Sequence, residues 1–230
     1  MDFRHRHVVV TGGTGALGVS VVGALLERGA VCHVPATGEK SIADFPHRAH
    51  PNAKISVAGS LSDEEAVTRF YATVPDLWAS VHLVGGYAGG KLRDTDRAAF
   101  MKQVEMNLVT CFLCCRAAAN AMKAGGRIVN VAARPGLEWR HGAGMTAYAA
   151  AKAGVAALTV ALAEEVVKDG ILVNAVAPST MDTPANRESM PKAKHADWPK
   201  VEEVAETILF LASPENRVTR GAVATVYGKA

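Results

Sequence analysis

Short runs of apolar, mostly β-branched residues recur along the chain and alternate with longer segments that are amphipathic or rich in alanine. Strands that are apolar throughout and separated by helices are typical of a parallel sheet covered by helices on both faces. The pattern therefore predicts an α/β protein with a Rossmann-type, doubly wound, seven-stranded parallel sheet. The expected strands lie near residues 7–11, 31–34, 54–57, 80–84, 127–131, 171–176 and 222–227.

Capping residues place two helix boundaries. Ser62 precedes an acidic first turn and predicts a helix start, while Asp169 and Gly170 predict the end of a long helix that begins near Thr146. No linker or repeat interrupts the order, so residues 1–230 are expected to form a single domain. The least regular segment, 178–200, carries four prolines and is expected to be a lid over a substrate.

Composition and charge narrow the class of partner. The chain is 49% hydrophobic and 20% charged, which are ordinary values for a globular protein, and its formal net charge is +3. Dispersed lysines and arginines with so small a net charge argue against nucleic acid or an anionic membrane as a partner. The sequence has no run of ~18 apolar residues and no signal-peptide core near its N-terminus. We expect a cytoplasmic protein with a small-molecule substrate.

The cysteines and histidines do not have the spacing of a metal site. Three of the four cysteines lie in the apolar segment CFLCC, without a second ligand pair at zinc spacing. They are expected to be reduced core thiols, because free cysteine is often buried, and a metal or redox role is the less favoured alternative. We therefore expect no bound metal. The cysteines are Cys32, Cys111, Cys114 and Cys115.

A glycine-rich motif, TGGTGALG, follows the first predicted strand and opens a helix. In a dinucleotide-binding turn, Gly12 would permit the tight turn, Gly15 would let the backbone approach a pyrophosphate, and Gly18 would allow close packing of helix and sheet. A purely structural turn is the alternative.

Tyr148 and Lys152 are four residues apart, so a helix places them on one face. A cation beside a phenol stabilises the phenolate and is expected to lower the pKa of Tyr148 toward neutrality, which suits a proton donor. The alternative is a chance pair on a solvated face. The small residues around the pair, in AYAAAKAGVAAL, favour close approach of a cofactor or another helix.

Together these motifs resemble the short-chain dehydrogenase/reductase family, over essentially the whole chain. The resemblance implies an NAD(P)-dependent oxidoreductase in which Tyr148 donates a proton, Lys152 tunes it and Asn107, in VEMNL, supports a relay water. It also implies a homodimer or homotetramer formed through the helices that carry CFLCC and Tyr148. The implied cofactor-binding residues are Gly12, Thr14, Gly15, Leu17, Gly18, Ser60, Leu61, Val84, Gly85, Tyr148, Lys152, Pro178, Met181 and Thr183.

The sequence departs from the family pattern at three places. Ala16 stands where the commonest subgroup has its middle glycine, and residues 82–85 read HLVG where the family has NNAG. The family's serine falls on Ala133, so no hydroxyl is expected there to hold a substrate carbonyl.

The quinonoid dihydropteridine reductases are a branch of the family that tolerates loss of the serine. The chain resembles them in GALG, in VGGYAGG at 84–90, and in DTPANRESMP followed by Trp198. This resemblance implies hydride transfer to an electron-poor ring such as a quinonoid dihydropteridine. The alternatives are a reductase of ketones or 3-oxoacyl groups, with water or Thr146 in place of the serine, and a catalytically silent nucleotide-binding scaffold.

The substrate pocket and the cofactor preference are less strongly indicated. Tyr87 is expected to form an aromatic wall, although a packed surface tyrosine is as good an interpretation, and His141 with Ala133 is placed at the pocket. No acidic residue directly follows the second strand, where VPATGEK begins, which favours NADP over NAD. Thr37, Lys40 or backbone groups would then have to bind the 2′-phosphate.

Overall fold

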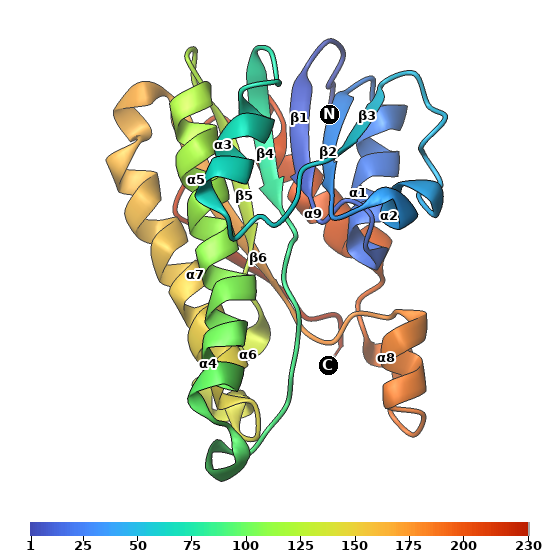
Figure 1. The fold of residues 1–230 in the computed structure, drawn as a ribbon, viewed down its shortest axis with the longest axis vertical. Helices are drawn as coiled ribbons and strands as arrows, with labels where there is room; N and C mark the ends of the chain where they lie inside the picture. Colours follow the sequence, from blue (N-terminus) through green and yellow to red (C-terminus); the bar gives the residue numbers. More distant parts are fainter. Residues whose placement is uncertain (230) are drawn as a thin grey trace.

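The computed structural model describes residues 1–229, in which seven parallel strands form one sheet with the order β3-β2-β1-β4-β5-β6-β7 (Figure 1). This order and direction confirm the predicted fold class. The seven predicted strands are all present: the first matches, four are longer by one or two residues, the fourth begins three residues and ends two residues earlier, and the seventh is shorter by one residue at each end. Their bounds are β1 (His7–Thr11), β2 (Val31–Ala36), β3 (Ala53–Val57), β4 (Leu77–His82), β5 (Gly126–Val131), β6 (Ile171–Pro178) and β7 (Val223–Val226).

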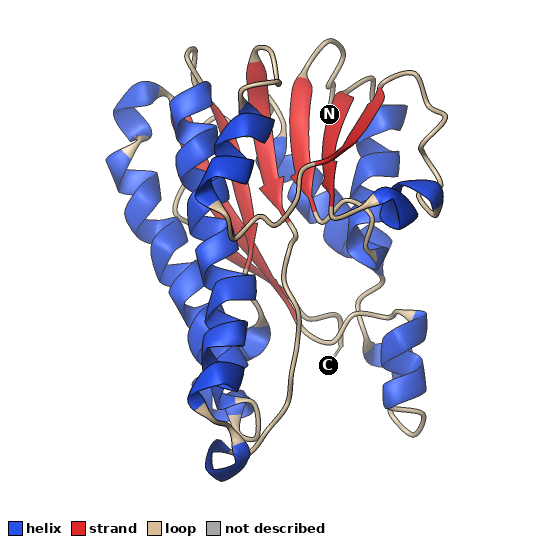
Figure 2. Cartoon of the chain, viewed as in Figure 1, coloured by secondary structure: helices blue, strands red, loops and turns tan. Residues whose placement is uncertain are grey.

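Helices cover both faces of the sheet (Figure 2). α1 and α9 pack on one face, and α3, α5 and α7 pack on the other. The helix bounds are α1 (Ala16–Glu27), α2 (Glu39–Ala43), α3 (Glu64–Tyr71), α4 (Arg97–Val104), α5 (Thr110–Ala121), α6 (Arg134–Leu137), α7 (Thr146–Glu165), α8 (Pro184–Ser189) and α9 (Val201–Ala212).

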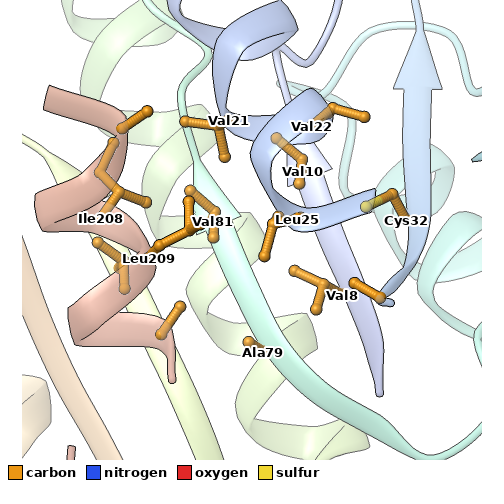
Figure 3. Packing of buried hydrophobic residues seen from close by; sticks show 14 of the residues in the cluster. Val8, Val10, Val21, Val22, Leu25, Cys32, Ala79, Val81, Ile208 and Leu209 are labelled. Atoms are coloured by element: carbon orange, nitrogen blue, oxygen red, sulfur yellow. The ribbon is translucent and has the colours of Figure 1, made fainter. Parts of the chain in front are cut away.

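Alternate side chains of β1 enter two separate hydrophobic cores. Val8 and Val10 face the core formed with α1 and α9, in which Leu25 and Leu209 are fully buried (Figure 3). Val9 faces the opposite core, beneath α3, α5 and α7. Burial on both faces explains why the strand is apolar at every central position rather than at alternate ones.

α7 is long and apolar enough to cross a membrane by length and composition. In the fold it is a core helix: it packs against α4, α6 and β6, and its residues Val155 and Ala163 lie in the core beneath the sheet. Its apolar character is therefore explained by burial inside the protein.

Two predicted helix boundaries need correction. α3 is capped by Asp63, not Ser62: the Asp63 carboxylate accepts a hydrogen bond of 3.0 Å from the Glu65 N–H. α7 ends at Glu165 rather than near Asp169, and a 3-10 turn at Val167–Asp169 follows before Gly170, whose φ of 74° lies in the left-handed region. The expected glycine stop is correct, but a short turn separates it from the helix.

The segment 178–200, expected to be irregular, contains a short helix. It begins with the last residue of β6, continues through α8 and a 3-10 turn at His195–Asp197, and returns to the fold where Asp182 bridges Lys200. Figure 1 shows α8 standing apart from α4 and α6. An ion pair between Arg187 and Asp182, with N–O distances of 2.5 and 2.8 Å, links α8 to the residues that directly precede it.

The corrected cap can be tested by substitution. We expect Asp63→Ala to lower the free energy of unfolding by about 1 kcal/mol, since it removes the side-chain acceptor of the first turn. Ser62→Ala is the matched control and should have a smaller effect, because the Ser62 hydroxyl bonds to Ser60 and not to the helix. Urea denaturation of the two variants measures the difference, and a larger loss in Ser62→Ala would contradict the assignment.

Candidate functional site

The carboxyl ends of the parallel strands meet at one edge of the sheet and bring the predicted motifs together. The glycine loop follows β1, the segment 83–90 follows β4, Ala133 lies two residues after β5, and the segment 179–183 follows β6. Ligands of open α/β sheets bind at this edge, near the point where strand order reverses. Here that point lies between β1 and β4.

The glycine loop has the geometry that a dinucleotide phosphate requires. Gly12 adopts φ 67°, and a Cβ there would lie 2.9 Å from the backbone of Leu83; a Cβ on Gly18 would lie 2.1 Å from the Gly12 oxygen. Gly15 is exposed, and no side chain caps the first turn of α1, so its N–H groups and positive dipole end face outward. The buried Thr11 hydroxyl beside the loop has no hydrogen-bond partner within residues 1–229. These features fit a bound dinucleotide.

Lys152 is buried on α7 and points toward the end of β5. Its ammonium donates a hydrogen bond of 2.8 Å to the Val131 carbonyl oxygen. Gly136 packs on its backbone, and a Cβ at Gly85 would lie 3.1 Å from Nζ. Burial lowers the pKa of Lys152 to about 8, and the nearby Cys111 thiol opposes this shift. The charged form is therefore less favoured than on an exposed lysine.

Tyr148 lies one turn before Lys152, whose Nζ is 5.9 Å from the centre of the phenol ring. Burial raises the pKa of Tyr148 to about 12, and the neighbouring Tyr87 adds to the shift. The expected lowering by Lys152 is thus wrong for this arrangement of side chains, because desolvation of the phenolate is the largest effect. Tyr148 is a protonated phenol here, in the state of a proton donor.

Asn107 is held at the site by an irregular turn. Residues Glu105–Val109 form a π-helical turn between α4 and α5, and Asn107 is buried within it. Its side-chain amide exchanges two hydrogen bonds with Gly86, one to the oxygen at 3.0 Å and one from the N–H at 3.1 Å, and also donates to the Gln103 oxygen. A Cβ on Gly85 would lie 2.7 Å from its Oδ1. The structure therefore brings Asn107, Gly85 and Lys152 together.

Tyr87 lies over Tyr148 on the segment that leaves β4. The two rings are perpendicular, with centroids 5.3 Å apart, and Tyr87 is 62% exposed. Gly90, farther along the same segment, donates a hydrogen bond of 2.7 Å to the Gly144 oxygen and bridges Met145. The segment from β4 is thus attached to the start of α7, and it holds Tyr87 against Tyr148.

Ala133 is buried at the start of α6 and begins a loop of charged side chains. The Arg134 guanidinium donates to the Glu138 carboxylate at 2.8 Å, and His141 lies 3.3 Å from the same carboxylate. The Arg134 guanidinium holds the pKa of Glu138 below its usual range. Arg134 also stacks over Tyr227, with 4.8 Å between Cζ and the ring centroid. His141 is accordingly a surface member of a charged group beside the site.

The other predicted cofactor residues are at the same edge, with different exposure. Leu17 and Leu61 are buried in the two hydrophobic cores, so their backbones rather than their side chains are available to a ligand. Thr183 caps α8 by accepting from the Asn186 N–H at 3.2 Å. Thr14, Ser60, Val84, Pro178 and Met181 lie in the connections after β1, β3, β4 and β6 or, for Pro178, at the end of β6 itself.

A buried polar cluster below the site was not found by sequence reasoning. His82 at the end of β4 lies with Cys111 and Cys115 of α5, their ligand atoms within 4.8 Å of one another. His82 bonds to Asn130 at 2.8 Å and to Ser80 at 2.8 Å, so its imidazole has partners on both nitrogens. All four cysteines are free and buried, as expected. The sequence signal that could have predicted this cluster is the four-residue spacing of Cys111 and Cys115.

Comparisons with known proteins agree with this geometry. The family model described as short chain dehydrogenase matches residues 6–194. A cis-4-hydroxycyclohexanecarboxylate dehydrogenase of Sinomonas cyclohexanicum is 33% identical, covering 98% of this chain and 96% of its own. A 3-oxoacyl-(acyl-carrier-protein) reductase of Vibrio harveyi is 29% identical, covering 99% and 98%. The solved structure of gox2181 is 28% identical with a TM-score of 0.89, covering 99% and 96%.

Burial of the Lys152 ammonium predicts how the free energy of unfolding depends on pH. Below about pH 8 the folded and unfolded chains both hold the Lys152 proton, and the folded state carries the full cost of the buried charge. From pH 8 to about 10.5 the unfolded chain binds more protons, so stability rises with pH. At pH 7 we expect Lys152→Met to have a free energy of unfolding up to about 3 kcal/mol above that of the wild type, reduced by the cost of leaving the Val131 oxygen without its partner. This advantage should disappear as the pH rises from 8 to about 10.5.

Denaturation curves at several pH values measure this difference. The exposed Lys192→Met variant is the control, for which the difference from wild type should not vary with pH. A difference between Lys152→Met and wild type that stays constant from pH 7 to 10.5 would show that burial of the ammonium has no such cost.

Proposed function

The chain belongs to the short-chain dehydrogenase/reductase family of NAD(P)-dependent oxidoreductases, and we propose that it interconverts a secondary alcohol and a ketone on a small molecule. The observation that carries the proposal is the meeting of Tyr148, Lys152 and Asn107 beside an open glycine loop. A protonated phenol next to a binding site for a nicotinamide cofactor is suited to adding a proton to an oxygen while a hydride adds to carbon.

Each residue of the group has a distinct role in this proposal. A bound nicotinamide supplies the hydride in the reductive direction. Tyr148 then donates its proton to the carbonyl oxygen as that oxygen gains charge, and the Lys152 ammonium stabilises the phenolate that is left. Asn107 is hydrogen-bonded to Gly86 and thereby keeps its own turn in place. This turn supports a relay water that leads toward Lys152. The glycine loop and the start of α1 bind the pyrophosphate.

The ketone reaction is favoured over reduction of a ring. The two curated relatives described above are named for an alcohol dehydrogenation and for reduction of a 3-oxoacyl group. The resemblance to quinonoid dihydropteridine reductases rests on motifs in the segments 84–90 and 182–198, and Ala133 is the observation that supports it, because a methyl group there cannot hold a carbonyl. Ring reduction is therefore the second candidate, ahead of a catalytically silent scaffold.

NADP is the cofactor that we favour. Ala36 ends β2, and Thr37, Gly38 and Lys40 follow at the place where a ribose 2′-substituent is bound in this fold. Thr37 pairs with Ser41 at 3.2 Å, and Lys40 is exposed. A hydroxyl pair with a nearby ammonium suits a phosphate better than it suits a free hydroxyl. The exposed Glu39, also in the first turn of α2, is the feature that opposes this preference.

Tyr148→Phe tests the proposed reaction. We expect turnover to fall roughly 10²–10⁴-fold, since a positioned proton donor contributes that much, while cofactor affinity is retained. The assay uses NADH and NADPH in turn with a 3-oxoacyl thioester, a cyclic ketone and a quinonoid dihydropterin. Wild-type turnover of the dihydropterin alone would select the second candidate, and equal rates for Tyr148→Phe and wild type would remove Tyr148 from the mechanism.

We also propose that the chain is a homodimer or homotetramer, joined through the outer faces of α5 and α7. Phe112 and Val160 are 48% and 47% exposed on these helices, and Phe100 of α4, near the first turns of α7, is 41% exposed. Large exposed apolar side chains on one face indicate an interface between copies.

Val160→Glu is expected to dissociate this assembly, because it places a charge in the apolar contact. Light scattering should then give a 24.1 kDa particle for the variant and a multiple of that mass for the wild type. Val218→Glu is the control, since Val218 is 85% exposed and lies in the connection to β7, and it should leave the mass unchanged. A wild-type mass of one chain would contradict the proposal.

A further inference from the structure

We propose that the Tyr87 hydroxyl replaces the serine hydroxyl that is missing at Ala133, and that it donates a hydrogen bond to the substrate oxygen that Tyr148 protonates. This inference rests on the proposed function and adds a second phenol to its site. It assigns Tyr87 a role beyond that of an aromatic wall.

The first support is the position of the Tyr87 ring. It meets the ring of Tyr148 edge to face, at 5.3 Å between centroids and 85° between planes, so the two phenols border the same space. Tyr87 is 62% exposed, whereas Tyr148 is half-buried. Tyr87 is therefore the more accessible of the two rings.

The second support is the way in which the chain holds Tyr87. A Cβ on Gly89 would lie 2.7 Å from the Tyr87 hydroxyl oxygen, so the phenol folds back across a position where any side chain would displace it. Gly90 is bonded to Gly144, four residues before Tyr148, and Asn107 fixes Gly86 from the other end. Two anchors around a three-residue segment hold the backbone of Tyr87 beside the start of α7.

The third support is chemical. The Tyr87 hydroxyl has no hydrogen-bond partner among the side chains and backbone of residues 1–229, so it is available to a ligand. Ala133 is buried and offers only a methyl group. In the proposed role Tyr87 keeps its proton throughout, Tyr148 transfers its own, and the donated hydrogen bond stabilises negative charge on the oxygen. Tyr87 adds to the rise in the pKa of Tyr148, of which burial is the larger cause.

The test is a cycle of two substitutions in the full-length enzyme with a ketone substrate. Tyr87→Phe keeps the ring and removes the hydroxyl, so kcat should fall roughly 10-fold to 100-fold, as for loss of one donor to a developing oxyanion. Adding Ala133→Ser to Tyr87→Phe should restore kcat to within about threefold of the wild type, because the two hydroxyls substitute for each other and their effects are not additive. Ala133→Ser alone should change kcat little.

Controls separate this inference from the proposed function. Tyr71→Phe removes a phenol hydroxyl that bonds to Ser80 in the core and should leave kcat unchanged, and cofactor affinity measured by fluorescence should be equal in all variants. If Tyr87→Phe retains wild-type kcat, or if Ala133→Ser fails to relieve its loss, the inference is overturned while a loss in Tyr148→Phe still supports the proposed function. No turnover of any alcohol or ketone by the wild type would instead overturn the proposed function.

Discussion

Burial of the Lys152 ammonium is the constraint on which the rest of the site depends. A charged group that is removed from water must find a fixed partner, and the Val131 carbonyl at the end of β5 provides it. This contact sets how closely α7 approaches the sheet, and Gly136 and Gly85 have no side chain that would prevent the approach. Tyr148 lies one turn away on the same helix, with its ring centre 5.9 Å from Nζ, so the contact that fixes Lys152 also positions the proposed proton donor.

The sequence predicted the architecture well because its signals were local. Apolar strands, a glycine loop after the first of them and a tyrosine and lysine four residues apart each report on their own segment, and all are found in the structure. The features that were missed depend on distant segments. Desolvation by the surrounding fold reverses the expected pKa of Tyr148, and only the sheet brings His82 next to Cys111. Asp63 rather than Ser62 caps α3 because the helix begins one residue later than the first acidic run suggested.

The segment 178–200 and the charged loop after Ala133 both lie at the edge of the sheet that carries the candidate site. Arg134 and Glu138 form an ion pair directly after Ala133, and Arg187 pairs with Asp182 at the start of α8. Both pairs stay within their own loops, so they shape these loops without linking them to the glycine loop. In the proposed function, substrate selection and cofactor binding would thus use separate segments of one sheet edge, which is common where a fold hosts many reactions.

The π-helical turn at Glu105–Val109 has a consequence for how this chain tolerates changes in length. The turn contains one residue more than an α-helical turn but rotates the chain through about the same angle, so it adds a residue while α4 and α5 keep nearly the same rotational phase. Deleting a single codon here would therefore restore regular α-helix and leave both helices packed as before. The residue that such a deletion displaces is Asn107, whose side chain would no longer reach the backbone of Gly86. The loss would fall on the contact between this turn and the segment after β4, while the buried Cys114 would stay in the core.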